Sequence, residues 1–184
     1  MTTSPTPATN GTRRLAIRLL ERRDIEEARI LHNDDATLAR LTDVTHVTEP
    51  QQEAWFQSVS TSRTSRRYVA RRRDDDAFVG LFRVDRIDLQ NRNCLVGCDI
   101  VPSLRRQGHA REFYGYMLDY LFLQLGLHRV GLVTLADNDG ALALYRALGF
   151  AEEGREREAI FRSGRFHDLV AMGLLASEWR RGDG

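Results

Sequence analysis

Lysine is absent from this 184-residue sequence, in which all 27 strongly basic side chains are arginine. The absence excludes a Schiff-base lysine and the lysine of a phosphate-binding P-loop, and it argues against a kinase-type phosphate site. The sequence also contains 26 acidic residues, so the net charge is +1. Such an even balance argues against a nucleic-acid-binding protein, and short arginine clusters such as 71–73 fit a solvated surface.

Cysteine is scarce, and long apolar runs are missing. Cys94 and Cys98 cannot form a structural zinc site alone, and the five histidines are scattered without metal-ligand spacing, so we expect no metal. Two buried thiols are typical of a reducing cytoplasm. No stretch is apolar enough for a membrane span. Residues 1–13 are rich in Thr, Ser and Pro and lack the apolar core of a signal peptide, so we expect a disordered tail before a single domain over 14–184.

Hydrophobic patterning predicts a mixed α/β domain. Alternating or continuous apolar runs predict strands over 15–20, 66–73, 78–87, 94–101 and 128–135, and two more after Phe150 joined by a turn at Ser163-Gly164. The run 94–101 is typical of a strand buried on both faces. Because a helix separates it from 128–135, these two strands should be parallel and joined by a right-handed crossover.

Capping residues and the spacing of apolar residues predict several helices. Asp24 and Glu27 have capping-box spacing, as do Thr48 and Gln51, and these pairs predict helices from about 24 and over 50–61. A short helix is expected within 35–41 and another over 139–148. The longest prediction is 110–126, which should end at Gly126. Its apolar face comprises Phe113, Met117, Tyr120, Leu121 and Leu125.

The loop 102–109 connects a buried strand to the start of that long helix. The first turn of a helix leaves backbone N–H groups unpaired at the positive end of its dipole, so an anion is stabilised there. Gly108 has no side chain to keep an anion away, and Ala110 is small. Taken alone, "RRQGHA" (105–110) is equally compatible with a charged loop that simply starts a helix.

The same stretch resembles motif A of the GNAT superfamily of acyl-CoA-dependent N-acyltransferases, Arg/Gln-x-x-Gly-x-Gly/Ala after a strand. The resemblance extends over about 14–179 and is strongest with the branch that acetylates ribosomal-protein N-termini, amino sugars and spermidine. Its marks after motif A are Asn138, Tyr145, Leu148-Gly149-Phe150, Glu153-Gly154 and "RFHDLVAMGLL". It implies a mostly antiparallel central sheet in which one parallel strand pair splays apart to bind acyl-CoA, with helices on both faces, and dimers are common in such folds.

The resemblance also implies site residues. Acetyl-CoA would lie between the strands 94–101 and 128–135, with its pantetheine arm against the backbone of Asp99, Ile100 and Val101. Amides of 106–111 would hold the pyrophosphate, and Asn138 and Tyr145 would contact the cofactor. The amide-contributing residues are Arg106, Gln107, Gly108, His109, Ala110 and Arg111. Tyr145 would protonate the departing thiolate, because a phenol can supply a proton as the thiolate forms.

The chain departs from the branch at the expected general base. Many relatives carry Glu two residues before the glycine of this strand, where this sequence has Leu95-Val96-Gly97. Asp99 is a candidate replacement on the same strand face. A water chain, or an amine that arrives deprotonated, serves equally well.

The resemblance implies that the acceptor is a primary amine of a small molecule or a protein N-terminus. His32, Asn33 and Trp55 are candidates to contact it. The alternative to an acetyltransferase is a non-catalytic domain that binds or senses acyl-CoA, and nucleic-acid binding through the arginine clusters is a third hypothesis. The near-neutral charge and the lack of interleaved stacking aromatics argue against the third.

Overall fold

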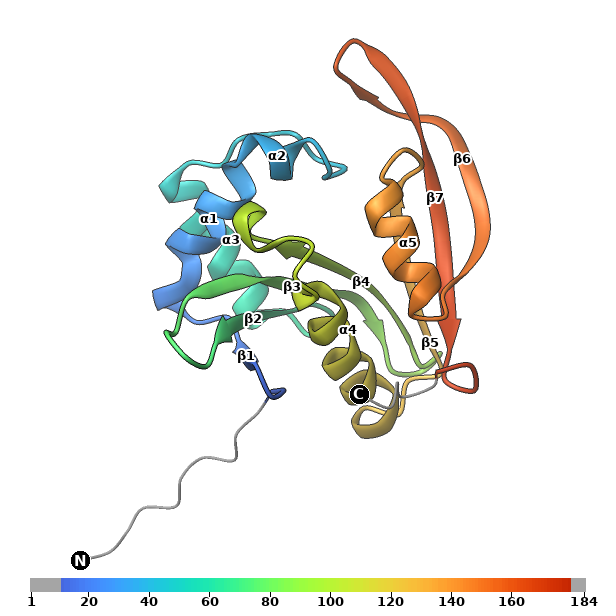
Figure 1. Ribbon diagram of the computed structural model, residues 1–184, viewed down its shortest axis with the longest axis horizontal. Helices are drawn as coiled ribbons and strands as arrows, with labels where there is room; N and C mark the ends of the chain where they lie inside the picture. The colour runs from blue at the N-terminus through green and yellow to red at the C-terminus, as the bar shows by residue number, and fades with distance from the viewer. Residues whose placement is uncertain (1–10, 180–184) are drawn as a thin grey trace, which may run out of the picture.

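The computed structural model describes residues 11–179, which form a seven-stranded sheet with helices on both faces (Figure 1). The strand order is β1-β2-β3-β4-β5-β7-β6, and every neighbouring pair is antiparallel except β4 and β5. The mixed sheet with one parallel pair confirms the expected fold class. The strands are β1 Leu15–Leu19, β2 Arg66–Arg72, β3 Phe78–Asp88, β4 Asn93–Ile100, β5 Arg129–Leu135, β6 Ala151–Arg162 and β7 Arg165–Leu175.

The helices divide between two hydrophobic cores. One core joins the sheet to α4 and α5 through side chains such as Phe82, Phe113 and Leu142, and the other joins it to α1 and α3 through Leu31 and Phe78. Burying apolar area on both sides explains why helices cover both faces of the sheet. The helices are α1 Ile25–Asn33, α2 Asp35–Leu38, α3 Glu49–Thr61, α4 His109–Asp119 and α5 Asp139–Ala147, with short helical turns η1 Arg22–Asp24, η2 Pro102–Leu104 and η3 Tyr120–Gln124.

The parallel strands β4 and β5 separate partway along their length. They pair only from Asn93 with Arg129 to Leu95 with Gly131. Beyond this point β4 remains paired with β3 as far as Ile100, and β5 remains paired with β7 as far as Leu135. The sheet therefore opens in its middle. The expectation that β4 is buried on both faces is wrong, because its residues alternate between buried and half-buried and its far end lines this opening.

The start of α1 differs from the predicted capping box. The Asp24 carboxylate does not cap α1 but accepts the backbone N–H of Glu21 (2.9 Å) and ion-pairs with Arg18 (2.6 Å) and Arg71 (3.2 Å). Asp24 is fully buried. The helical segment starts one turn earlier, at η1, where Glu21 and Asp24 form a capping box. The ion pairs of Asp24 with arginines of β1 and β2 could not be predicted from local spacing. The Thr48–Gln51 box before α3 forms as predicted.

The long helix is interrupted where one residue is added to a turn. The α-helix ends at Asp119 and continues as the wider turn η3, in which Leu125 N–H donates to Tyr120 O (3.0 Å). The added residue rotates the side chains after it about the helix axis. Leu121 stays fully buried, whereas Leu125, expected on the apolar face, is 39 % exposed. Gly126 ends the turn with φ +64°, as predicted.

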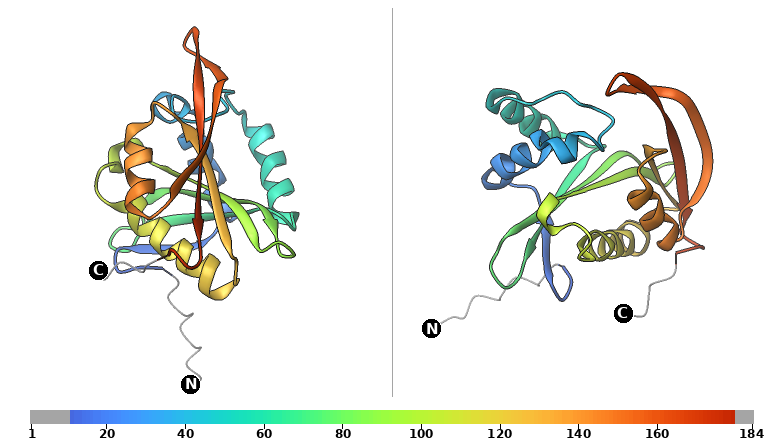
Figure 2. Two further views of the ribbon diagram at one scale, coloured as in Figure 1. Left: turned by 90° about the vertical axis from the view of Figure 1, so that its right-hand side faces the viewer. Right: turned by 45° about the horizontal axis from the view of Figure 1, so that its top comes forward.

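The β6–β7 hairpin extends beyond the body of the sheet (Figure 2). Its turn, Ser163 (φ 50°) and Gly164 (φ 77°), has the positive dihedrals that its sequence predicts. Residues 1–10 of the expected tail lie outside the described part of the chain. The next residues contact the domain: Gly11 bridges to Ala16, and the Thr12 hydroxyl donates to the Glu112 carboxylate at the start of α4.

Candidate active site

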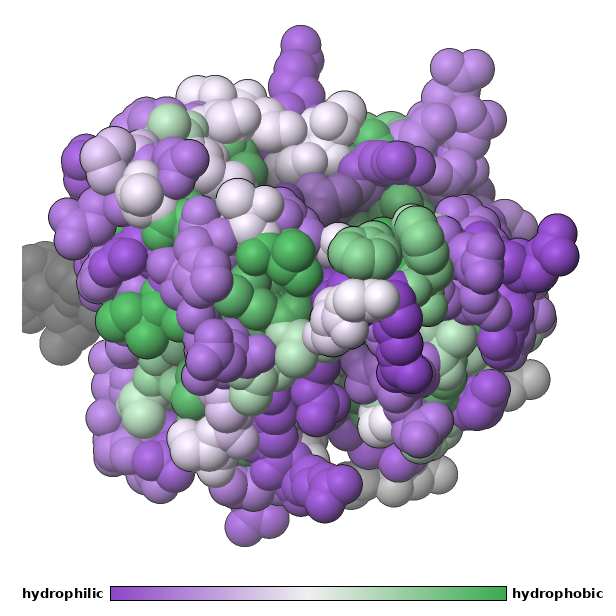
Figure 3. Space-filling view, turned by 90° about the horizontal axis from the view of Figure 1, so that it is seen from above, coloured by the Kyte–Doolittle hydropathy of each residue, from purple (hydrophilic) through white to green (hydrophobic). Residues whose placement is uncertain are grey.

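A cavity of about 850 Å³ occupies the opening between β4 and β5. Its walls come from the segment after α2, the far end of β4, the loop into α4, the outer half of β5 and the start of α5. Seen from above, the surface is hollowed between the α2 side and the hairpin side, and both hydrophilic and hydrophobic residues surround the hollow (Figure 3). The splayed strands therefore create an open cleft with a mixed polar and apolar lining.

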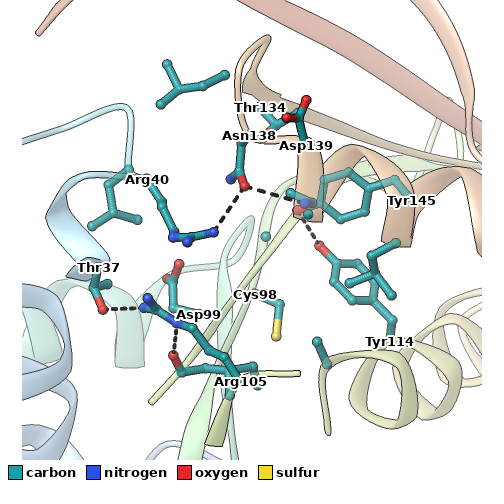
Figure 4. Close-up of a pocket in the computed structure, with 18 of the residues that line it drawn as sticks. Thr37, Arg40, Cys98, Asp99, Arg105, Tyr114, Thr134, Asn138, Asp139 and Tyr145 are labelled. Atoms are coloured by element: carbon teal, nitrogen blue, oxygen red, sulfur yellow. Dashed lines mark hydrogen bonds between the residues drawn. The ribbon is translucent and has the colours of Figure 1, made fainter. Parts of the chain in front are cut away.

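Two tyrosines meet in the wall of the cavity. The Tyr114 hydroxyl from α4 donates to the Tyr145 hydroxyl from α5 over 3.4 Å (Figure 4). Both side chains are buried, at 1 % and 8 % exposure. Burial raises the pKa of Tyr145 to about 12, although the hydrogen bond from Tyr114 acts to lower it. Because its pKa is raised, the Tyr145 hydroxyl keeps its proton at the wall of the cavity.

Cys98 on β4 lines the cavity close to these tyrosines. Burial is the main cause that raises the pKa of this thiol well above its ordinary value. The same burial would act on any thiolate formed beside it, since desolvation penalises the charged form. A thiolate leaving group here is thus a stronger base than in water. The pKa of its thiol therefore lies closer to the pKa of the Tyr145 hydroxyl. Cys98 itself stays a thiol and is a weak nucleophile.

The loop before α4 presents unpaired amides to the cavity. Arg106 and Gly108 have φ of 61° and 82°, and Gly108 is the residue that precedes α4. The first intrahelical bond is donated by Glu112 N–H to Gly108 O (3.1 Å). The N–H groups of 109–111 precede it and have no intrahelical acceptor. Arg106 and Arg111 line the same end of the cavity, so the end suits an anion.

Arg105 differs from Arg106, because its guanidinium is held by hydrogen bonds to neighbouring elements. Its guanidinium donates to Ile100 O (2.9 Å), Ala36 O (3.0 Å) and Thr37 Oγ1 (2.7 Å). These three bonds fix α2 against the end of β4 and so shape one wall of the cavity. Within "RRQGHA", Arg105 therefore has a structural role, whereas the backbone that follows it is suited to an anion.

Asp99 lies on the cavity side of β4, where Arg83 of the adjacent strand ion-pairs with it over 3.4 Å. Arg83 stands opposite Gly97 in the β3–β4 register. A Cβ at position 97 would lie 2.5 Å from Arg83 Nη2, so this glycine leaves room for the guanidinium. The nearby charge of Asp99 is the main cause that raises the pKa of Arg83. An ion pair between Arg83 and Asp99 therefore lies on β3 and β4 at the cavity, four residues along β4 from Leu95, the position at which the resemblance places a glutamate.

Asn138 caps α5 and faces across the cleft. Its side-chain oxygen accepts from Ala141 N–H (3.4 Å) and from Arg40 Nη1 (3.3 Å). Arg40 follows α2 on the opposite wall (Figure 4). The contact brings together residues separated by 98 positions, and sequence patterning did not single out Arg40.

The structure brings most of the predicted residues together. The cavity wall includes Asp99, Ile100, Arg106, Gly108, Ala110, Arg111, Asn138 and Tyr145. The side chains of Val101, Gln107 and His109 do not line it: Val101 packs in the α1–α3 core, Gln107 Nε2 donates to Ser103 O (3.0 Å), and His109 is buried. Sequence reasoning missed Arg40, Arg83 and Tyr114, whose placement depends on contacts across the fold.

The three acceptor candidates lie away from the cavity wall. Asn33 exchanges two hydrogen bonds with the Val47 backbone, both 2.8 Å, and His32 Nε2 lies 3.0 Å from Thr45 O. Both residues hold the segment between α2 and α3. Trp55 packs in the second core, with Arg67 over its ring at 5.9 Å. Their positions support structural roles.

Metal ligands do not gather anywhere in residues 11–179, which contain no group of three or more His, Cys, Asp or Glu that could hold a metal ion. Among the helices of the same residues, none is long and apolar enough to cross a membrane.

Comparison with known proteins identifies the class. The pattern of the family described as the acetyltransferase (GNAT) domain matches residues 14–151, and the chain belongs to this family. It is an N-acetyltransferase by class, which confirms the resemblance seen in its motifs.

Individual relatives agree with this assignment. The chain is 29 % identical over 168 residues to a spermidine N(1)-acetyltransferase of Vibrio cholerae, and the match covers 90 % of this chain and 95 % of the relative. It is 30 % identical over 105 residues, 57 % of each chain, to YdaF of Bacillus subtilis, a candidate ribosomal N-acetyltransferase. A crystal structure of the Vibrio cholerae spermidine N-acetyltransferase with CoA and spermine superimposes with a TM-score of 0.86 at 28 % identity, covering 91 % of this chain and 98 % of that one.

Proposed function

We propose that this protein transfers an acetyl group from acetyl-CoA to a primary amine by direct attack, with Tyr145 as the general acid. The observation that carries the proposal is the Tyr145 hydroxyl, which lies in the wall of the cleft between β4 and β5, within hydrogen-bond distance of Tyr114. The amine nitrogen bonds to the acetyl carbonyl carbon, the C–S bond breaks, and Tyr145 delivers its proton to the sulfur.

The cleft supports acetyl-CoA as the donor. The free edge of β4 beyond Leu95 offers backbone groups to the extended pantetheine arm. The unpaired amides of 109–111, with Arg106 and Arg111 beside them, suit the pyrophosphate. A Cβ at position 108 would lie 3.3 Å from Arg14 Nη2, so the absence of a side chain leaves this part of the loop uncrowded. The solved relative that contains CoA has the same overall fold.

The proton that the amine loses is assigned to Asp99, either directly or through water. Asp99 lines the cavity and is the carboxylate on β4 closest to the position where relatives carry Glu. Asp99→Asn should lower kcat/KM more at pH 7 than at pH 9, because more of the amine is already deprotonated at the higher pH. An equal loss at both pH values would remove Asp99 from this role.

Calorimetry with acetyl-CoA tests the proposal, followed by CoA release with a panel of amines. The panel comprises an N-terminal peptide, an amino sugar, a polyamine and an amino acid. We expect saturable binding of acetyl-CoA and amine-dependent CoA release. If millimolar acetyl-CoA does not bind, the proposed function is wrong.

A further inference from the structure

The end of the cavity away from α4 is lined by positive charge that nearby carboxylates offset only in part. Arg40 forms no ion pair within the part of the chain that the structure describes, and its hydrogen bond there goes to the neutral Asn138 side chain. Within residues 11–179, Arg105 donates to neutral oxygens, those of Ile100, Ala36 and Thr37. The two guanidiniums are close enough to interact: burial first, and then the charge of Arg40, lower the pKa of Arg105, and the charges of Asp34 and Asp99 offset this effect only in part.

A third arginine lies directly behind this wall. Arg162, at the end of β6, donates from Nη1 to Ala39 O (2.8 Å), and Ala39 lines the cavity next to Arg40. Arg162 is only 8 % exposed, and its Nε and Nη2 are buried without a partner among residues 11–179. Leaving buried donors unsatisfied is costly. The hairpin therefore adds a cation to the wall that carries Arg40, one that forms no ion pair within the described residues and on which only the more distant charge of Asp137 acts.

The carboxylates of the cavity offset this charge only in part. Asp99 is paired with Arg83, and Asp137 is paired with His167 (2.7 Å) and Arg165 (3.4 Å). Asp139 is exposed in the first turn of α5, where the helix dipole stabilises a carboxylate. The cations at the α4 end, Arg106 and Arg111, are accounted for by the phosphates of the donor. Arg40, Arg105 and Arg162 are not.

From these charges we infer that the acceptor is an amine that carries its own anionic group, a carboxylate or a phosphate, which Arg40 binds with support from Arg105 and Arg162. The inference rests on the proposed function and adds the substrate class. The amine would approach Asp99 and Tyr145 while its anion faces the α2 wall (Figure 4). A polyamine brings only positive charge to this wall, so this chain should differ in acceptor from its spermidine-acetylating relatives.

Matched acceptors test the inference. Acetyl-CoA-dependent CoA release is measured with five α-amino acids and their carboxamides, with phosphoethanolamine and ethanolamine, and with spermidine. We expect at least one anionic amine to exceed its neutral analogue roughly tenfold or more in kcat/KM, the scale of one charge-assisted hydrogen bond. The two arms distinguish a carboxylate from a phosphate.

Two variants locate the preference. Arg40→Gln should reduce the ratio of anionic to neutral acceptor roughly tenfold, mainly through KM of the anionic member. Arg63→Gln removes an exposed arginine outside the cavity wall and serves as the charge-matched control, with an unchanged ratio.

The outcomes separate the two claims. Equal use of anionic and neutral amines, a preference for spermidine, or an unchanged ratio in Arg40→Gln would overturn the inference and leave the acetyltransferase proposal standing. A protein that binds no acetyl-CoA and releases no CoA with any amine overturns the proposed function itself, and the acceptor inference falls with it.

Discussion

Tyr145→Phe is the substitution that tests the chemistry most directly, because it removes one oxygen and keeps the ring. The ring packs against Tyr114 and Phe150, with centroids 5.6 and 5.9 Å away, and phenylalanine preserves both contacts. Loss of a general acid lowers kcat by about 10²–10⁴-fold, or about 3–5 kcal/mol of transition-state stabilisation. The assay is CoA release at saturating donor and acceptor.

The same substitution has a predictable effect on stability. The Tyr114 hydroxyl is buried and donates to Tyr145, so Tyr145→Phe leaves a buried donor unpaired at a cost of about 1–3 kcal/mol in the free energy of unfolding. The double variant Tyr114→Phe/Tyr145→Phe removes both polar groups and should recover much of that stability without recovering turnover. Urea unfolding measures the first effect, and kcat measures the second.

The pH profile provides a further check on this residue. Because burial raises the pKa of Tyr145 to about 12, the hydroxyl keeps its proton at ordinary pH. Its ionisation should therefore not reduce kcat below about pH 10. If Tyr145→Phe leaves kcat within about threefold of the parent while acetyl-CoA affinity is unchanged, Tyr145 is not the acid.

Three other changes probe the rest of the fold and the site. Gly108→Val should weaken acetyl-CoA binding by about tenfold or more, because a branched side chain at φ 82° strains the loop and crowds the amides beside it; equal affinity by calorimetry would contradict the role of the loop. Cys98→Ala should retain most turnover, since burial raises the pKa of this thiol and keeps it protonated; an acetylated Cys98 trapped by mass spectrometry would instead indicate a covalent intermediate. Asp24→Asn should lower the free energy of unfolding by about 3 kcal/mol, because it leaves Arg18 and Arg71 facing a neutral amide. Burial acts to raise the pKa of Asp24, but hydrogen bonds led by that from Arg18 lower it overall. Its stabilisation is therefore complete above about pH 4, the ordinary carboxyl range, and is lost as the pH falls further, so the parent and Asp24→Asn should converge in stability in acid; a constant difference would refute this account.

Local signals predicted the elements well wherever neighbours along the chain decide the conformation. The Thr48 cap, the Ser163-Gly164 turn and the Gly126 stop each depend on a few adjacent residues, and each forms as expected. The prediction at Asp24 was wrong because arginines from β1 and β2 compete for its carboxylate. Periodicity also could not show that an extra residue in the turn after Asp119 would rotate Leu125 toward solvent.

The class of fold and the family follow from the sequence alone, because short motifs and the order of strands and helices carry them. Gly108, Asn138 and Tyr145 were recognisable for the same reason. The surroundings of these residues, in contrast, depend on long-range contacts in the folded chain. The opening between β4 and β5 exists because their pairing stops at Leu95, which depends on how each strand pairs with its other neighbour. The charged wall around Arg40 exists because α2, β4 and the β6–β7 hairpin converge there, through contacts between residues up to 123 positions apart. Long-range packing of this kind leaves no periodic trace in a single sequence.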